Sequence, residues 1–162
     1  MKRLEANGES LIGKLVIEYR GEEFLPHTWR RFSSYCVGRK VIGHHVGFDN
    51  QWIVKDAFDS GQLDTHPNKE ELLSIERTFV MQNQHKDILQ KVFSIARINY
   101  GRADFSLYKD RVQIFEINTN PWHGCYEEVL EKSHPGRRAS LKRSEDELNQ
   151  AIRELHSDSP PR

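Results

Sequence analysis

The chain has little cysteine: only Cys36 and Cys125 occur among its 162 residues, far apart and without a Cys-x-x-Cys partner. This spacing favours free thiols and indicates neither a disulfide scaffold nor a zinc site. Long apolar runs are lacking too, and the first ten residues contain no signal-peptide core, so we expect a cytoplasmic protein without a membrane span. Neither sign of charge dominates, because 24 Lys and Arg balance 24 Asp and Glu, and nothing indicates a nucleic-acid-binding surface. A Walker-type phosphate loop, Gly-x-x-x-x-Gly-Lys-Ser/Thr, is also missing.

The composition that remains is that of one folded domain. Its length suffices to bury a core, and 10% aromatic residues argue against a wholly disordered chain. Among eight histidines only His44 and His45 are adjacent, and neighbouring strand residues point to opposite faces of a sheet. We therefore expect these two to be ordinary strand residues and not a metal site.

Residues 100–121 have the alternation of a β-hairpin with one apolar and one polar face. The apolar set, broken only by Gln113, is Ala103, Phe105, Leu107, Phe115 and Ile117. The polar set is Arg102, Asp104, Ser106, Glu116 and Asn118. Because the polar side chains gather at the end of the hairpin away from its turn, we expect a ligand to bind there.

The register of the hairpin decides whether these polar groups meet. A two-residue turn at positions 109 and 110 would pair Asp104 with Phe115 and mix the two faces, which the side-chain pattern opposes. A three-residue connection over positions 109–111 keeps the faces separate. The predicted register is this second one, with the pairs Asp104–Glu116 and Arg102–Asn118.

Two facing carboxylates need a cation or a shared proton between them, because directly paired residues have Cβ atoms about 4.5–5.5 Å apart. Carboxylate and amide oxygens suit Mg²⁺ or Mn²⁺. The pattern therefore predicts a metal site formed by Asp104, Glu116 and Asn118. The alternative, that Asp104 and Glu116 are solvated residues on the wet face of a sheet, remains open at this point.

The rest of the chain predicts an α+β fold, an antiparallel sheet with helices packed on one face. Strands are expected at residues 14–20, 32–37, 40–48 and 51–55. Apolar residues recur at helical spacing from Asn68 onward and again over 88–96, with a break at 82–85.

The part of the chain after Pro121 is expected to be less regular. A short amphipathic piece is predicted at 127–130, a basic loop at 133–142, and a helix at 144–155 that starts with the capping box Ser144 and Glu147. The last six residues are polar and expected to be disordered. We therefore divide the chain into a main unit, residues 1–130, and a C-terminal part, residues 131–162.

The order of these parts resembles the ATP-grasp superfamily, whose members mostly join a carboxylate to an amine through an acyl-phosphate. The resemblance covers about residues 13–124, and its specific part is Gly-Arg-Ala-Asp-Phe at 101–105 followed by Glu-Ile-Asn-Thr-Asn-Pro at 116–121. It implies that the main unit is similar to an ATP-grasp C-terminal subdomain.

The resemblance also implies roles for particular residues. Asp104, Glu116 and Asn118 would hold Mg²⁺ or Mn²⁺ against the β- and γ-phosphates of ATP. Arg102 would be the catalytic residue that stabilises charge on the transferring phosphoryl group, with a salt bridge to one of the carboxylates as the alternative. Arg31 could contact phosphate or a substrate carboxylate, but the favoured interpretation is an exposed strand arginine. The nucleotide-binding residues implied at the adenine and ribose are Glu18, Tyr19, Arg20 and Glu23.

ATP-grasp enzymes clamp the nucleotide between two subdomains, and the one with the phosphate-binding lysine and glycine-rich loop comes before the strand at Leu15. We therefore expect the chain to be the C-terminal half of a ligase: a fragment, a truncated gene product or one member of a split enzyme. Its expected function is to bind metal and ATP phosphates in an ATP-dependent carboxylate–amine (or thiol) ligase. Small-molecule carboxylate and amine substrates are expected, with a missing N-terminal half or a second copy as partner.

Two alternatives remain open. The first is a non-catalytic binding or interaction module, derived from an ATP-grasp fold, that lacks the N-terminal clamp. The second is a metal-dependent phosphohydrolase, which fits the oxygen ligands but lacks an evident water-activating base.

Overall fold

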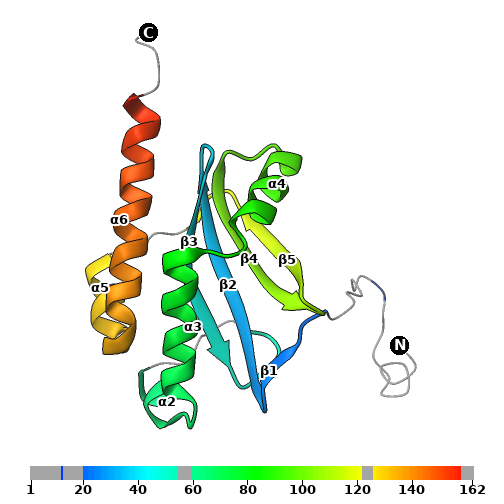
Figure 1. The fold of residues 1–162 in the computed structure, drawn as a ribbon, viewed down its shortest axis with the longest axis vertical. Coiled ribbons are helices and arrows are strands. Elements are labelled where there is room, and N and C mark those ends of the chain that lie inside the picture. Colours follow the sequence, from blue (N-terminus) through cyan, green and yellow to red (C-terminus); the bar gives the residue numbers. More distant parts are fainter. Residues whose placement is uncertain (1–11, 13–19, 55–59, 122–125, 158–162) are drawn as a thin grey trace.

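The computed structural model describes residues 12, 20–54, 60–121 and 126–157. Within these ranges the fold is α+β, with a curled antiparallel sheet and helices against it, as predicted (Figure 1). The strands are β1 (Glu23–Leu25), β2 (Thr28–Val37), β3 (Lys40–Asp49), β4 (Tyr100–Tyr108) and β5 (Arg111–Asn118). The helices are α2 (Ser60–Thr65), α3 (Lys69–Gln82), α4 (Lys86–Ala96), α5 (Tyr126–Lys132) and α6 (Pro135–Ser157). The strand predicted at 14–20 lies, except for Arg20, outside the described residues.

β2 is the central strand of the sheet. It pairs antiparallel with β3 on one side and with β4 on the other, β5 extends the sheet beyond β4, and the short β1 pairs with the start of β2 (Figure 1). The predicted β2–β3 hairpin is confirmed, and its turn contains Gly38 at a φ of 60°, a left-handed conformation that glycine adopts without steric cost. The strand predicted at 51–55 is wrong, because residues 51–53 form a bend in which Trp52 and Ile53 are exposed.

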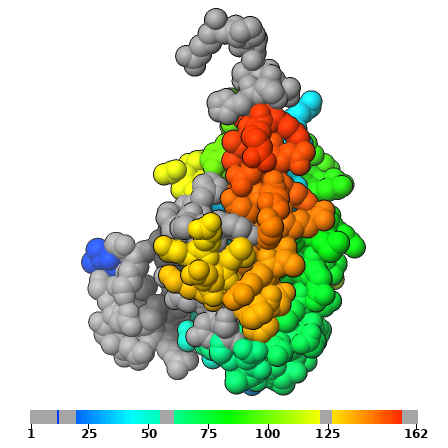
Figure 2. Space-filling view, turned by 90° about the vertical axis from the view of Figure 1, so that its left-hand side faces the viewer, coloured from blue at the N-terminus to red at the C-terminus, as the bar shows by residue number. Residues whose placement is uncertain are grey.

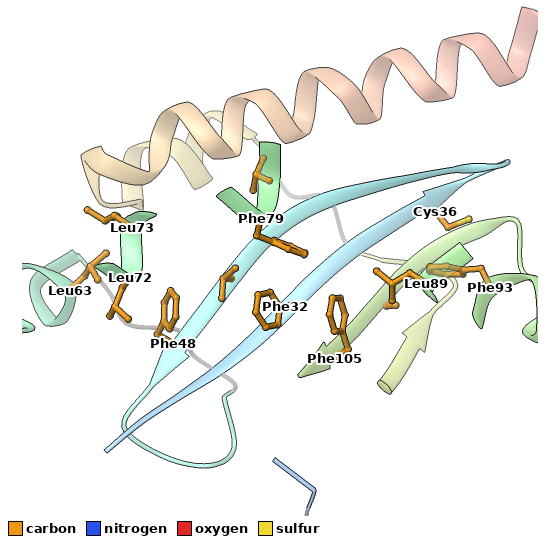
Figure 3. Close-up of a cluster of buried hydrophobic side chains, with 13 residues drawn as sticks. Phe32, Cys36, Phe48, Leu63, Leu72, Leu73, Phe79, Leu89, Phe93 and Phe105 are labelled. Atoms are coloured by element: carbon orange, nitrogen blue, oxygen red, sulfur yellow. The ribbon is translucent and has the colours of Figure 1, made fainter. Parts of the chain in front are cut away.

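One face of the sheet carries the larger apolar core, which α3 and α4 cover. Figure 3 shows Phe48, Phe32 and Phe105 side by side across the sheet, with Phe79 of α3 above them. The rings of Phe32 and Phe105 stack with centroids 5.3 Å apart, and that of Phe79 lies 4.9 Å from Phe32. Both predicted helices are confirmed, and the break between them is at Asn83, which has a left-handed conformation.

α6 begins at Pro135, so the predicted basic loop at 133–142 and the predicted helix start at Ser144 are wrong. Ser144 does not cap a helix: it is fully buried inside α6, and its hydroxyl lies 3.0 Å from Nδ1 of His44. Figure 2 shows α6 laid along the surface with α5 beside it. Ser144 of α6 faces the protein because it has a partner there in His44, which helical periodicity alone cannot reveal.

A buried ion pair ties α6 to the rest of the fold. Arg137 of α6 donates through Nε and Nη2 to the carboxylate of Glu76 on α3, at 3.0 and 2.6 Å. Glu76 is only 1% exposed and also accepts the backbone N–H of Val46 on β3 at 3.1 Å. Three elements therefore meet at this one carboxylate.

A second apolar cluster joins the later part of α6 to the sheet. Leu148 and Ala151 pack against Tyr35, Val37 and Ile42, on the face of β2 opposite to Phe32. The helix thus shares a core with β2 and β3, and a boundary at residue 130 would separate elements that pack together. None of the described helices combines the length and apolar character needed to cross a membrane.

Candidate functional site

The polar groups that the sequence assigns to the site lie on β4 and β5 in the predicted register. Asp104 pairs with Glu116, and Arg102 pairs with Asn118. All four side chains belong to the face of the sheet opposite to the phenylalanine core, because Ala103 and Phe105, which alternate with them, are buried in that core.

The connection between the two strands differs from the predicted one. It is a two-residue turn of Lys109 and Asp110, both with positive φ, 50° and 58°, as a type I′ turn requires. The register is recovered further along, where Phe105 pairs with Ile114 and a β-bulge leaves Phe115 without a partner. The bulge supplies the one extra residue that the shorter turn lacks.

The bulge also changes the side on which Phe115 lies. Phe115 was predicted on the apolar face, but it is 51% exposed and lines a pocket on the polar side. Ile114 takes its place opposite Phe105. Gln113 pairs with Ser106 on the polar side, so it no longer interrupts the alternation.

Asp104 is the most enclosed member of the predicted site, with 3% of its surface exposed. The hydroxyl of Ser33 on β2 donates to its Oδ1 at 2.6 Å. Arg102 approaches both oxygens, with Nε 3.2 Å from Oδ1 and Nη2 3.4 Å from Oδ2, and Nη1 of Arg31 lies 3.9 Å from Oδ2. Two guanidinium groups therefore compensate the charge of a carboxylate that is withdrawn from water.

Both arginines keep unused donors beside this carboxylate. The Nε atoms of Arg31 and Arg102 are buried and have no hydrogen-bond partner within the part of the chain that the structure describes. The salt bridge from Arg102 to Asp104, the alternative to its catalytic role, is thus present, but its Nε contact lacks hydrogen-bond geometry. Leaving a buried donor unsatisfied costs about 1–3 kcal/mol.

A pocket of about 520 Å³ opens next to these groups, a size typical of small-molecule sites. Its apolar wall comes from Trp29, Trp52, Ile53 and Val54, and Trp52 is 57% exposed. The remaining lining consists of residues 20–22, Arg30, Arg31, Asp104, Ser106, Phe115 and Glu116. Apolar side chains on one side and arginine and carboxylate side chains on the other therefore line a single pocket.

Of the predicted nucleotide-binding residues, Glu18 and Tyr19 lie outside the described residues. Arg20 is exposed and lines the pocket, and its guanidinium group lies 5.8 Å from the centre of the Tyr108 ring. The structure therefore brings Arg20 to the same pocket as Asp104 and Glu116, whereas Asn118 and Arg102 do not line it.

Glu23 has a local partner instead. It is the first residue of β1, and its carboxylate accepts the backbone N–H of His27 in the following turn. Its neighbour Glu22 lines the pocket and accepts the backbone N–H of Lys109 at the tip of the β4–β5 hairpin. In the described part of the chain, the acidic side chain that lines this end of the pocket is Glu22, not Glu23.

The donor set can be compared with the needs of a magnesium ion. Within the described residues no three His, Cys, Asp or Glu side chains gather closely enough to hold a metal ion. Asp104 and Glu116 are nonetheless direct cross-strand partners, and Asn118 on the same face offers an amide oxygen that already accepts the N–H of Asn120 at 2.9 Å. Because Mg²⁺ is commonly held by one or two carboxylates plus phosphate oxygens and waters, this set fits a metal that arrives with a phosphate ligand.

Sequence reasoning missed Ser33 and His45 and misplaced His44. A bulge leaves His44 unpaired between Gly43 and His45, and the two histidine rings lie 4.6 Å apart, so the expectation of opposite faces is wrong. Nε2 of His45 lies 3.3 Å from the hydroxyl of Ser33. Burial lowers the pKa of His45 well below its usual value, and nearby His44 and three arginines act in the same direction.

The signal that could have found Ser33 is its parity on β2, which it shares with Arg31 and Tyr35. That parity becomes informative only once β2 is known to pair with β4.

No protein-family model matches the chain, and the chain has no significant match among curated proteins or solved structures.

Proposed function

We propose that this chain supplies the metal- and phosphate-binding half of an ATP-dependent carboxylate–amine (or thiol) ligase of the ATP-grasp type. One observation carries the proposal. Arg20, which the resemblance assigns to the nucleotide, and Asp104 and Glu116, which it assigns to the metal, line a single pocket although they are distant in sequence.

The residues of this chain would divide the work as follows. Asp104 and Glu116 would hold Mg²⁺ or Mn²⁺ together with Asn118, and the metal would neutralise charge on the β- and γ-phosphates. Arg31, which lines the pocket, would bind phosphoryl oxygens with charge and paired donors, and Arg102 beside Asp104 would stabilise charge on the transferring phosphoryl group. The apolar wall around Trp52 would exclude water from the acyl-phosphate formed when a substrate carboxylate attacks the γ-phosphorus and ADP departs.

The test is the binding of ATP, measured by isothermal titration calorimetry with and without Mg²⁺. Glu116→Gln keeps the shape of the side chain but removes its charge, so it should weaken Mg²⁺-dependent ATP binding by about tenfold or more. Glu131→Gln, an exposed carboxylate on α5, is the matched control and should bind like the wild type. Equal affinity of Glu116→Gln and wild type would refute the metal assignment.

A second candidate is the non-catalytic binding module. The observation in its favour is the apolar rim of the pocket, where Trp52, Ile53 and Phe115 are 57%, 44% and 51% exposed. A module of this kind would bury the rim against a partner without turnover. Light scattering with and without ATP, together with an assay for ADP release, separates the two candidates, because only a ligase half should support product formation when its partner is added.

A further inference from the structure

One row of side chains crosses the sheet at the site. His45 on β3 pairs with Ser33 on β2, Ser33 pairs with Asp104 on β4, and Asp104 pairs with Glu116 on β5. Directly paired residues are the closest neighbours across strands, with Cβ atoms about 4.5–5.5 Å apart. The row therefore links a histidine on the far strand to the two carboxylates of the proposed metal site.

Hydrogen-bond chemistry fixes the direction of this row. A serine hydroxyl has one proton, and that of Ser33 is donated to Oδ1 of Asp104 at 2.6 Å, the length of a charge-assisted O–H···O⁻ bond. Toward His45, only lone pairs of the hydroxyl remain. Nε2 of His45, 3.3 Å away, must therefore carry the ring proton and donate it to Ser33, which leaves Nδ1 unprotonated in a neutral ring.

The contacts of Asp104 differ in how strongly they direct its carboxylate. The arginine contacts, at 3.2, 3.4 and 3.9 Å, supply charge but little direction. The bond from Ser33 is the short one, and Ser33 is fully buried, so its position is fixed by the sheet. A donor on its other side, His45, stops the hydroxyl from rotating toward other acceptors.

We propose that Ser33 and His45 are positioning residues that fix the orientation of the Asp104 carboxylate toward its ligand. This inference rests on the proposed function, since it assigns Asp104 to the metal and phosphate. Ser33 holds Oδ1, so that Oδ2 stays on the side of Arg31 and the pocket. Neither residue lines the pocket.

The first experiment measures Mn²⁺ binding in the presence of ATP, by the loss of the electron paramagnetic resonance signal of free Mn²⁺. Ser33→Ala should weaken binding by about tenfold. Ser34→Ala is the matched control: Ser34 is the equally buried neighbour on β2, but it faces the other side of the sheet, where its hydroxyl accepts from Asn83. If Ser33→Ala binds Mn²⁺ like Ser34→Ala, the inference is overturned.

Two variants of His45 separate positioning from packing. His45→Gln keeps an N–H donor at the place of Nε2 and should retain most of the Mn²⁺ affinity, whereas His45→Leu fills a similar volume without a donor and should lose about threefold or more. Equal affinities for His45→Gln and His45→Leu would show that the residue only fills space.

The second experiment reads the hydrogen-bond row directly, by ¹⁵N nuclear magnetic resonance of the His45 ring. The expected spectrum is that of the Nε2–H tautomer in the wild type and of a tautomer mixture in Ser33→Ala. An Nδ1–H tautomer in the wild type would refute the row itself. If the wild type shows the expected tautomer but does not bind Mn²⁺ with ATP, the proposed function fails and the assignment of the row to a metal ligand fails with it. If the wild type binds Mn²⁺ with ATP and Ser33→Ala binds it equally well, the inference fails while the proposed function stands.

Discussion

Replacing Arg137 by methionine should leave the Glu76 carboxylate buried without its cation. Glu76 is 1% exposed, and the three shortest nitrogen–oxygen contacts between the two side chains measure 2.6, 3.0 and 3.0 Å. Removing one partner of such a pair costs about 3–5 kcal/mol, because the remaining charge keeps its desolvation penalty and loses its compensation. Methionine retains much of the apolar length of arginine, so a cavity contributes little to this figure.

The assay is urea unfolding followed by circular dichroism. With a slope of about 2 kcal/mol per molar urea, a loss of about 4 kcal/mol moves the midpoint down by about 2 M. Arg138→Met, the adjacent and exposed arginine on α6, is the control and should stay within about 0.5 kcal/mol of the wild type.

A double variant decides whether the loss reflects the stranded charge. Glu76→Leu combined with Arg137→Met replaces both charges by apolar groups and should recover most of the stability, because buried pairs often contribute little net free energy. A midpoint for Arg137→Met within 0.5 M of the wild type, or a double variant no more stable than Arg137→Met, would show that the buried pair does not behave as described.

Three further predictions concern pH, the turn and a close contact. Because burial lowers the pKa of His45, only the unfolded state takes up a proton on this ring below about pH 6.5. The free energy of unfolding should therefore fall from pH 7 to pH 5, by up to about 1.4 kcal/mol per pH unit. Urea unfolding at several pH values should show a shallower fall in His45→Gln. An unchanged slope would contradict a neutral buried ring. Asp110→Gly should raise stability by about 0.5–1 kcal/mol, because glycine accepts the φ of 58°; a lower thermal midpoint would contradict the left-handed turn. Gly43→Ala should cost about 1–3 kcal/mol in urea unfolding, since the new Cβ would lie 2.8 Å from the carbonyl oxygen of Phe79, and a neutral effect would mean that β3 and α3 are not so close.

The β4–β5 hairpin shows what local pattern can and cannot predict. The pairing of Asp104 with Glu116 is predictable because only that register keeps the polar side chains on one face. Alternation does not predict how the hairpin reaches this register, because a three-residue turn and a bulge at Phe115 each add the same single residue. The two solutions differ in the side on which Phe115 lies, and in the structure Phe115 is exposed and lines the pocket.

Two further errors share one cause, which is contact between distant segments. The basic stretch at 133–142 lacks an apolar stripe and was predicted as a loop. In the structure it is helical from Pro135, and the helix is held by the ion pair of Arg137 with Glu76 and by the contact of Ser144 with His44. The role of Ser33 could not be predicted for the same reason. Its partner Asp104 is 71 positions away, and no spacing rule in the chain indicates that β2 and β4 are neighbours.

The pairing of β2 with β4 has a consequence for how the protein folds. The β2–β3 and β4–β5 hairpins can each form from local contacts. The pairing of Ser33 with Asp104 forms only when β2 and β4 meet, which closes a long loop that contains β3, α2, α3 and α4. Closure over long sequence separations is slow compared with hairpin or helix formation. The pocket beside Asp104 should therefore be among the last features to form during refolding, later than the early gain of helix.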